Sequence, residues 1–159
     1  DLNKLVDEYV NLAYHGVRAR VQGFPCELVR VYDDTIGEIE MVPQEMGRVF
    51  INLTDNAFYA VNEKRLNEDE YEPRVEIHTK KIKDGVEVSI SDNGYGIPRE
   101  IQDKIFEPFF TTKPTGSGTG LGLSLSHDIV VKGNGGTLSL ESEPEQGACF
   151  TVMLPATRE

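Results

Sequence analysis

The sequence has no tryptophan, few cysteines, few histidines and no long apolar run. Its two cysteines, Cys26 and Cys149, are too few for a disulfide framework or a cysteine-rich zinc site, and its three scattered histidines form no HExxH pair. No stretch approaches roughly eighteen consecutive apolar residues, and no charged-then-apolar leader opens the chain. We therefore expect a cytoplasmic piece without membrane contact. Because no initiator methionine is present, we expect it to be cut from a longer parent, and whether that parent is membrane-bound is left open by the sequence.

Basic residues are also scarce. The chain of 159 residues has 16 Lys and Arg against 27 Asp and Glu, which gives a net charge of -11. Binding to a nucleic-acid backbone needs a basic patch, so we exclude nucleic acid as a partner. A nucleotide can still bind through backbone amides, amide side chains and a divalent cation. The 38% hydrophobic content predicts one compact domain with enough apolar material for a core.

Apolar residues at helical spacing predict the main helices. The first runs from about residue 2 to 20 after an Asp or Asn cap, and its apolar stripe either packs in the core or partly faces a missing neighbouring domain. The second runs from about 43 to 62, beginning at Pro43. An acidic connector at 62 to 73 is expected to be a solvated loop. PREIQDKI predicts a short helix, and a last helix spans about 119 to 132, ending at Gly133.

Period-two alternation predicts the strands. CELVRVYD forms one strand, and GEIEM a possible short second one. PRVEIHTKK and GVEVSISD form a hairpin around Asp84-Gly85, and GGTLSLESEPEQGACFTVMLP forms another. The residues expected on the core face of the two hairpins are Val75, Ile77, Val86, Val88, Ile90, Leu138, Leu140, Phe150, Val152 and Leu154.

Asp92 ends the alternating run of the first hairpin, which puts a carboxylate on the apolar side of a strand. Burying an ionised carboxylate without a partner is strongly unfavourable, so we expect a donor, and the exocyclic amine of a bound base is one candidate. Gly94 and Gly96 follow, suiting a backbone that turns sharply or passes close to a flat ligand. The plainer alternative is a strand that ends in a DNG turn.

A second glycine cluster, at positions 116, 118, 120 and 122, runs directly into the last predicted helix. Free N–H groups and the positive end of the helix dipole form a general phosphate site. The alternative is a flexible glycine linker. Two better-known phosphate loops are excluded, because neither GxxxxGK[ST] nor GxGxxG occurs in the sequence.

The second helix carries a polar flank. Steps of about 100° per residue bring Arg48, Asn52, Asn56 and Tyr59 together. Two Asn residues at i and i+4 serve helix propensity poorly, because their side chains compete for backbone hydrogen bonds. We interpret them as functional; the alternative is a pair of solvated surface amides.

Four motifs then occur in order: NLTDNAFYA at 52 to 60, DNGYG at 92 to 96, FEPFF at 106 to 110 and GTGLGLS at 118 to 124. Together they resemble the catalytic, ATP-binding domain of bacterial sensor histidine kinases, in the ATPase group that includes gyrase, Hsp90 and MutL. The resemblance implies a Bergerat-type α+β fold, an α/β sandwich whose mixed sheet of about five strands has helices on one face. Residues 21–159 would form the ATP-binding catalytic domain, and residues 1–20 a first helix near the junction with a missing dimerisation domain.

The resemblance also implies roles for individual residues. Asp92 would bind the adenine amine, Asn56 would coordinate Mg2+ through its amide oxygen, and Asn52 would lie beside the phosphates. Residues 111 to 117 match a lid over the nucleotide, in which Lys113 would reach a phosphate. The full set expected to contact Mg-ATP is Asn52, Asn56, Tyr59, Asp92, Gly94, Gly96, Ile97, Phe109, Lys113, Gly118, Thr119, Gly120, Leu121, Gly122 and Leu123. Phe106, Phe109 and Phe110 match the aromatic motif before the lid, and at least one of them is expected to be core.

Asn52 is the expected catalytic residue. ATP-hydrolysing members of the group typically have a Glu general base four residues before the magnesium Asn. An amide accepts no proton at neutral pH, which disfavours hydrolysis and leaves transfer to an already nucleophilic imidazole. Two positions depart from the pattern: Tyr59 stands where many histidine kinases have a phosphate-contacting Lys, and Asn134 where a His is frequent, a change from which we derive no consequence.

We therefore expect a protein-histidine kinase domain that transfers the γ-phosphoryl group of Mg-ATP to a His on a separate dimerisation domain, and acts on a response regulator indirectly. His15, His78 and His127 lack the acceptor signature and are expected to be structural. Two alternatives are a slow ATPase of the gyrase type and a degenerate nucleotide-binding module that regulates a partner kinase. Asn52 argues against the first, and the intact Asp92 and Asn56 against the second.

Overall fold

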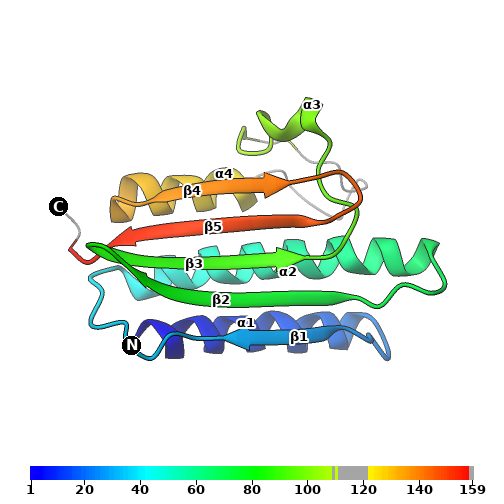
Figure 1. Ribbon diagram of the computed structural model, residues 1–159, viewed down its shortest axis with the longest axis horizontal. Helices are drawn as coiled ribbons and strands as arrows, with labels where there is room; N and C mark the ends of the chain where they lie inside the picture. Colours follow the sequence, from blue (N-terminus) through cyan, green and yellow to red (C-terminus); the bar gives the residue numbers. More distant parts are fainter. Residues whose placement is uncertain (109, 111–121, 158–159) are drawn as a thin grey trace.

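The computed structural model describes residues 1–108, 110 and 122–157. Within these residues, one mixed sheet of five strands has the order β1-β2-β3-β5-β4. The strands are β1 (Glu27–Val31), β2 (Arg74–Ile82), β3 (Gly85–Asp92), β4 (Thr137–Ser142) and β5 (Ala148–Pro155). Helices α1 (Leu2–Arg20), α2 (Pro43–Asn67) and α4 (Gly122–Asp128) lie together behind the sheet (Figure 1). This architecture confirms the predicted α/β sandwich.

Strand pairing brings the end of β3 next to two other segments. β1 pairs with β2 in parallel, whereas β2–β3, β3–β5 and β4–β5 are antiparallel. Asp92, the last residue of β3, pairs with Val75 near the start of β2. The turn between β4 and β5 reaches the same end of the sheet and contains Glu145 and Gly147, both with positive φ.

The core lies between the sheet and the helices, as the alternation predicts. In the first hairpin, all five predicted core residues are at most 1% exposed. In the second, Leu140 is only partly buried, whereas the other four predicted core residues are buried. The buried residues of α1 and α2 include Val6, Val10, Val49, Phe50 and Leu53.

Helix α1 begins and packs for identifiable reasons. The Asp1 side chain accepts hydrogen bonds from the N–H groups of Asn3 and Lys4, which confirms the predicted cap. The Tyr9 ring packs directly over Gly47 of α2, where an added Cβ would lie 2.2 Å from the ring. A glycine in the middle of α2 therefore allows the two helices to pack closely.

Three predicted boundaries differ from the structure. GEIEM does not form a strand; a backbone hydrogen bond of 3.0 Å joins the N–H of Glu40 to the carbonyl of Ala156 instead. The acidic connector is partly helical, because α2 continues to Asn67, where the Asn67 amide donates to the carbonyl of Glu63. The last helix ends in a short π-helix, η1 (Ile129–Gly133).

The helix expected in PREIQDKI is a single turn, α3 (Arg99–Gln102), which lies beyond the edge strand β4 (Figure 1). In the described part of the chain, no helix combines the length and the apolar character needed to cross a bilayer.

Candidate nucleotide-binding site

The carboxylate of Asp92 lies at the end of β3 and is held by backbone amides. Its Oδ1 accepts a hydrogen bond of 2.9 Å from the N–H of Gly94. Burial raises the pKa of Asp92 to about 6, against the opposing effects of the Gly94 and Ala148 amides and the charge of Lys64. The side chain is therefore mainly ionised at pH 7, and an ionised carboxylate accepts strong, charge-assisted hydrogen bonds.

Gly94 and Gly96 are required by close approaches of the chain to itself. A Cβ on Gly94 would lie 3.0 Å from the Asp92 carboxylate and 3.1 Å from Ala60 of α2. Gly96 has φ +80, and a Cβ there would lie 2.5 Å from the carbonyl oxygen of Glu143. The sequence predicts two reasons for these glycines, a sharp turn and passage of the backbone beside a flat ligand. The contacts within the chain account for the sharp turn without a ligand.

Ile97 follows this loop and is anchored from the opposite side. Its N–H donates to the Ser142 hydroxyl at 2.8 Å, and that hydroxyl donates to the carbonyl of Gly147 at 2.9 Å. Gln102 of α3 donates to the carbonyls of Ile97 and Ser142. The loop after Asp92 is thus fixed to the β4–β5 turn.

The polar flank of α2 lies next to this loop. Asn52, Asn56 and Tyr59 are partly exposed, whereas Arg48 is exposed. Desolvation raises the pKa of the Tyr59 phenol, and the nearby Glu63 carboxylate raises it further. Because Ala60 touches Gly94, the flank and the Asp92 loop meet in one region.

Asn52 contacts a residue that the sequence did not single out. Its Nδ2 donates to the hydroxyl of Ser126 at 3.3 Å, and Ser126 is completely buried in α4. The polar Ser within the LSLSHD segment was the available signal, but its spacing alone does not identify a partner. Gly122, the first residue of α4, has no atom within 4 Å of an added Cβ, and Leu123 is partly buried.

Several predicted contacts lie outside the described residues. These are Phe109, Lys113, Gly118, Thr119, Gly120 and Leu121, together with the whole predicted lid from 111 to 117. Phe106 is described, and its ring stacks near His127 at 5.2 Å and near Phe150 at 6.3 Å. Phe106 is therefore half-buried and packs against the core.

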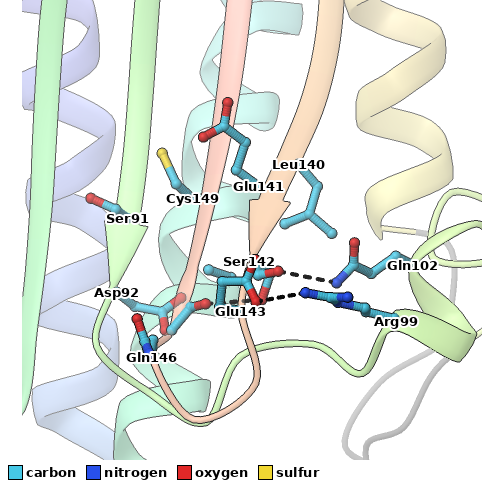
Figure 2. Close-up of a pocket in the computed structure, with 12 residues that line it drawn as sticks. Ser91, Asp92, Arg99, Gln102, Leu140, Glu141, Ser142, Glu143, Gln146 and Cys149 are labelled. Atoms are coloured by element: carbon cyan, nitrogen blue, oxygen red, sulfur yellow. Dashed lines mark hydrogen bonds and ion pairs between the residues drawn. The ribbon is translucent and has the colours of Figure 1, made fainter.

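A hollow of about 610 Å³ lies at the same end of the sheet (Figure 2). Asp92 lines it, together with Arg99, Gln102 and residues of β4, β5 and their turn. Arg99 and Glu143 form an ion pair of 3.0 Å across its rim. The hollow shares Asp92 and residues of the β4–β5 turn with the candidate site, but none of the polar residues on the α2 flank lines it.

Asn134, for which the sequence predicted no consequence, has a clear structural role. The residue is 1% exposed. Its Oδ1 accepts from the N–H of Val42 at 3.1 Å, and its Nδ2 donates to the carbonyl of Ile129 at 2.9 Å. One amide therefore joins the start of α2 to the π-helical end of the last helix.

Comparison with known sequences identifies a family. Residues 41–158 match the family model described as histidine kinase-, DNA gyrase B- and HSP90-like ATPase. The sensor histidine kinase ZraS of Escherichia coli (strain K12) is 33% identical over 155 residues, covering 98% of this chain and 30% of ZraS. The chain thus spans less than a third of that relative.

Solved structures agree with the sequence comparison. The catalytic domain of histidine kinase ThkA matches with a TM-score of 0.80 at 29% identity, covering 99% of this chain and 95% of that one. A structure of ThkA in complex with the response regulator protein TrrA matches with a TM-score of 0.77 at 28% identity, covering 99% of this chain and 41% of that one.

Proposed function

Because the chain belongs to the histidine kinase-, DNA gyrase B- and HSP90-like ATPase family, and is a catalytic domain of the sensor histidine kinase type, we propose that it binds Mg-ATP and transfers the γ-phosphoryl group to a histidine on a separate dimerisation domain. A response regulator would then receive the phosphoryl group from that histidine. The observation that carries the proposal is the half-buried carboxylate of Asp92, held by the Gly94 amide at the end of β3, where Gly94 packs against Ala60 of α2.

Asp92 would recognise the base. When ionised, its carboxylate can only accept hydrogen bonds, and the adenine amine is a donor, so the two groups are complementary. Guanine has a carbonyl oxygen in the corresponding position, which would face the carboxylate acceptor to acceptor. The Gly94 amide fixes one carboxylate oxygen, which orients the group before the base arrives.

Asn56 would hold Mg2+ through its amide oxygen. Mg2+ keeps several waters and binds through few protein groups plus substrate phosphates, so a single amide oxygen fits this ion. Among the described residues, no group of three or more His, Cys, Asp or Glu side chains could cage a metal, which agrees with an ion held mainly by its ligand. When bound, Mg2+ neutralises charge on the phosphates.

Asn52 would orient the phosphate groups without abstracting a proton. Ser126 accepts one hydrogen bond from the Asn52 amide and so restricts its rotation. An amide does not deprotonate water at neutral pH, which protects the nucleotide from hydrolysis, whereas an imidazole acceptor is already nucleophilic. The contacts of Lys113, Thr119 and the glycines up to Gly122 with the phosphates, and that of Tyr59, belong to this proposal.

A reconstituted transfer tests the function. The domain is mixed with its separate dimerisation domain and ATP labelled on the γ-phosphate. We expect acid-labile, base-stable label on the dimerisation domain, and none when its acceptor histidine is replaced by alanine. Release of inorganic phosphate at a faster rate than label transfer would instead identify a slow ATPase. Absence of ATP binding by calorimetry would favour a regulatory module.

A further inference from the structure

We propose that Lys64, in the last turns of α2, is a positioning residue for adenine recognition, because it clamps the three chain segments that surround Asp92. This inference rests on the proposed function. No motif includes Lys64, and it lies at the opposite end of α2 from the phosphate-binding residues predicted at the α4 side.

The ammonium group of Lys64 is held by two rings and a carbonyl. Its Nζ lies 5.0 Å from the ring centroid of Tyr71 and 5.4 Å from that of Tyr95, both within the range of cation–π attraction. It also donates to the carbonyl oxygen of Glu145 at 3.3 Å. Within the described residues, Lys64 makes no ion pair, so its positive charge is not neutralised by a contacting carboxylate.

Each segment that Lys64 touches also touches Asp92 or its neighbour Asn93. The Tyr71 hydroxyl donates to Asn93 Oδ1 at 2.7 Å. In the β4–β5 turn, the N–H of Glu145 donates to the carbonyl of Tyr95, and a Cβ on Gly147 would lie 1.9 Å from the Asp92 carbonyl oxygen. A single side chain therefore connects α2 with every loop that fixes the direction of the Asp92 carboxylate.

Tyr95 strengthens the clamp from its other end. Desolvation raises the pKa of the Tyr95 phenol, and a side-chain hydrogen bond with Glu68, just after α2, raises it further. Gly94, the preceding residue, packs on Ala60 one turn before Lys64. The loop after Asp92 thus contacts Ala60 within α2 and Glu68 just after it, and Lys64 lies about one turn from each.

The charge of Lys64 also acts on Asp92 directly. The titratable groups that face this carboxylate are Lys64 from α2, Tyr71 from the segment before β2, Cys26 from the segment before β1 and Cys149 from β5. Lys64 is the cation in this set, and it opposes the effect of burial on the Asp92 pKa. Its removal leaves the carboxylate less ionised as well as less firmly held.

The test is calorimetric binding of ATP and ADP to Lys64→Met and Lys64→Arg. Lys64→Met keeps the apolar stem and removes the charge, so we expect the Kd of both nucleotides to rise about tenfold, equally because the phosphates are not involved. Lys64→Arg keeps the cation over the rings and should stay within about threefold of the native chain. Lys80→Met is the matched control, since Lys80 is exposed on β2 and should change neither Kd.

A second readout separates positioning from plain stabilisation. The ATP affinity of the native chain should fall as the pH drops through about 6, where Asp92 takes up a proton, and Lys64→Met should shift this midpoint upward. Protonation of the nucleotide itself affects the native chain and Lys64→Met equally, so it cancels in the ratio of their two ATP affinities. An unshifted midpoint together with a native Kd would overturn the proposal for Lys64.

The proposal and the function it rests on fail differently. If the native chain does not bind ATP, the proposed function is wrong. If the native chain binds ATP, Asp92→Asn does not, and Lys64→Met binds like the native chain, only the role of Lys64 is wrong. Should Lys64→Met not fold, Tyr95→Leu removes one ring while keeping the charge; we expect about a threefold weaker affinity, and an unchanged one would overturn the clamp.

Discussion

The two ends of the candidate site are held in place by different kinds of contact, one by the backbone and the other by side chains. The end proposed to bind the base, called the base end and formed by Asp92, its loop and the β4–β5 turn, is fixed by backbone approaches too close for any side chain at Gly96 or Gly147. The phosphate end, formed by Asn52, Asn56 and Ser126, depends in the described residues on side chains that meet between α2 and α4, such as the 3.3 Å contact of Asn52 with Ser126. The base end is therefore held by the folded backbone, whereas the described part of the phosphate end is held by side-chain contacts.

The largest effect should come from a side chain placed in the base end. Gly147 has φ +92, and a Cβ there would lie 1.9 Å from the carbonyl oxygen of Asp92. Gly147→Ala should therefore lower the free energy of unfolding by about 3 kcal/mol, measured by urea denaturation. Gly37→Ala is the control, because no atom lies within 4 Å of its added Cβ and its φ is not positive. Equal stability of the two variants would refute the rigid base end.

Asp92→Asn should remove binding while keeping the fold. The amide would present a donor where the carboxylate now accepts, so the adenine amine would lose its partner and ATP affinity should fall by about 100-fold or more. Calorimetry measures the affinity, and circular dichroism verifies the fold. Micromolar binding by this variant would contradict the assignment of the adenine contact.

The same residue predicts a pH dependence of stability. Burial raises the pKa of Asp92 from 3.8 to about 6, so the native state binds a proton more tightly than the unfolded chain. This contribution to stability is fully present below the unfolded pKa of 3.8 and is lost as the pH rises through 6, amounting to about 3 kcal/mol by pH 7. Asp92→Asn lacks this loss, so its stability relative to the native chain should increase between pH 4 and 7 and then level off. A constant difference across this range would mean that the carboxylate is not desolvated.

The smallest effect should come from the phosphate end. Ser126→Ala removes one hydrogen bond to Asn52, worth about 1 kcal/mol, so the rate of transfer at saturating ATP should fall about fivefold. The Kd for ATP should stay within about twofold, because the base end is untouched. Ser139→Ala, on the exposed face of β4, serves as the control. If the transfer rate and the ATP affinity fell by the same factor, the proposed difference between the base end and the phosphate end would be wrong.

The strands and the base end could be predicted because their signals are local. Period-two alternation from Val86 to Asp92 fixes which face the carboxylate occupies, and that needs no knowledge of distant contacts. The end of α2 could not be placed, since polar residues after Asn62 look like a loop until the Arg65 and Asn67 side chains are seen bonding within the helix. GEIEM has strand composition but finds no ladder partner in the described sheet.

The supporting residues of the site were beyond sequence spacing. Ser126 lies 74 positions from Asn52, and Lys64 lies 81 positions from Glu145, so their contacts arise only when the helices and turns assemble. The motifs identify the groups expected to touch the nucleotide, and the fold identifies the side chains that hold them. Neither Asn56 nor Tyr59 is assigned a role by the structure, and both remain predictions.

The contact that the Asn134 amide makes between α2 and the last helix does not depend on pH. The amide accepts from Val42 and donates to Ile129 at the same time, and it holds no proton to gain or lose in the physiological range. An imidazole in this buried place, as related domains often have, would exchange its acceptor for a second donor near pH 6.5 and lose the Val42 bond. This chain can therefore keep α2 and the last helix in register at a pH that would break this contact in a relative with histidine at the same position.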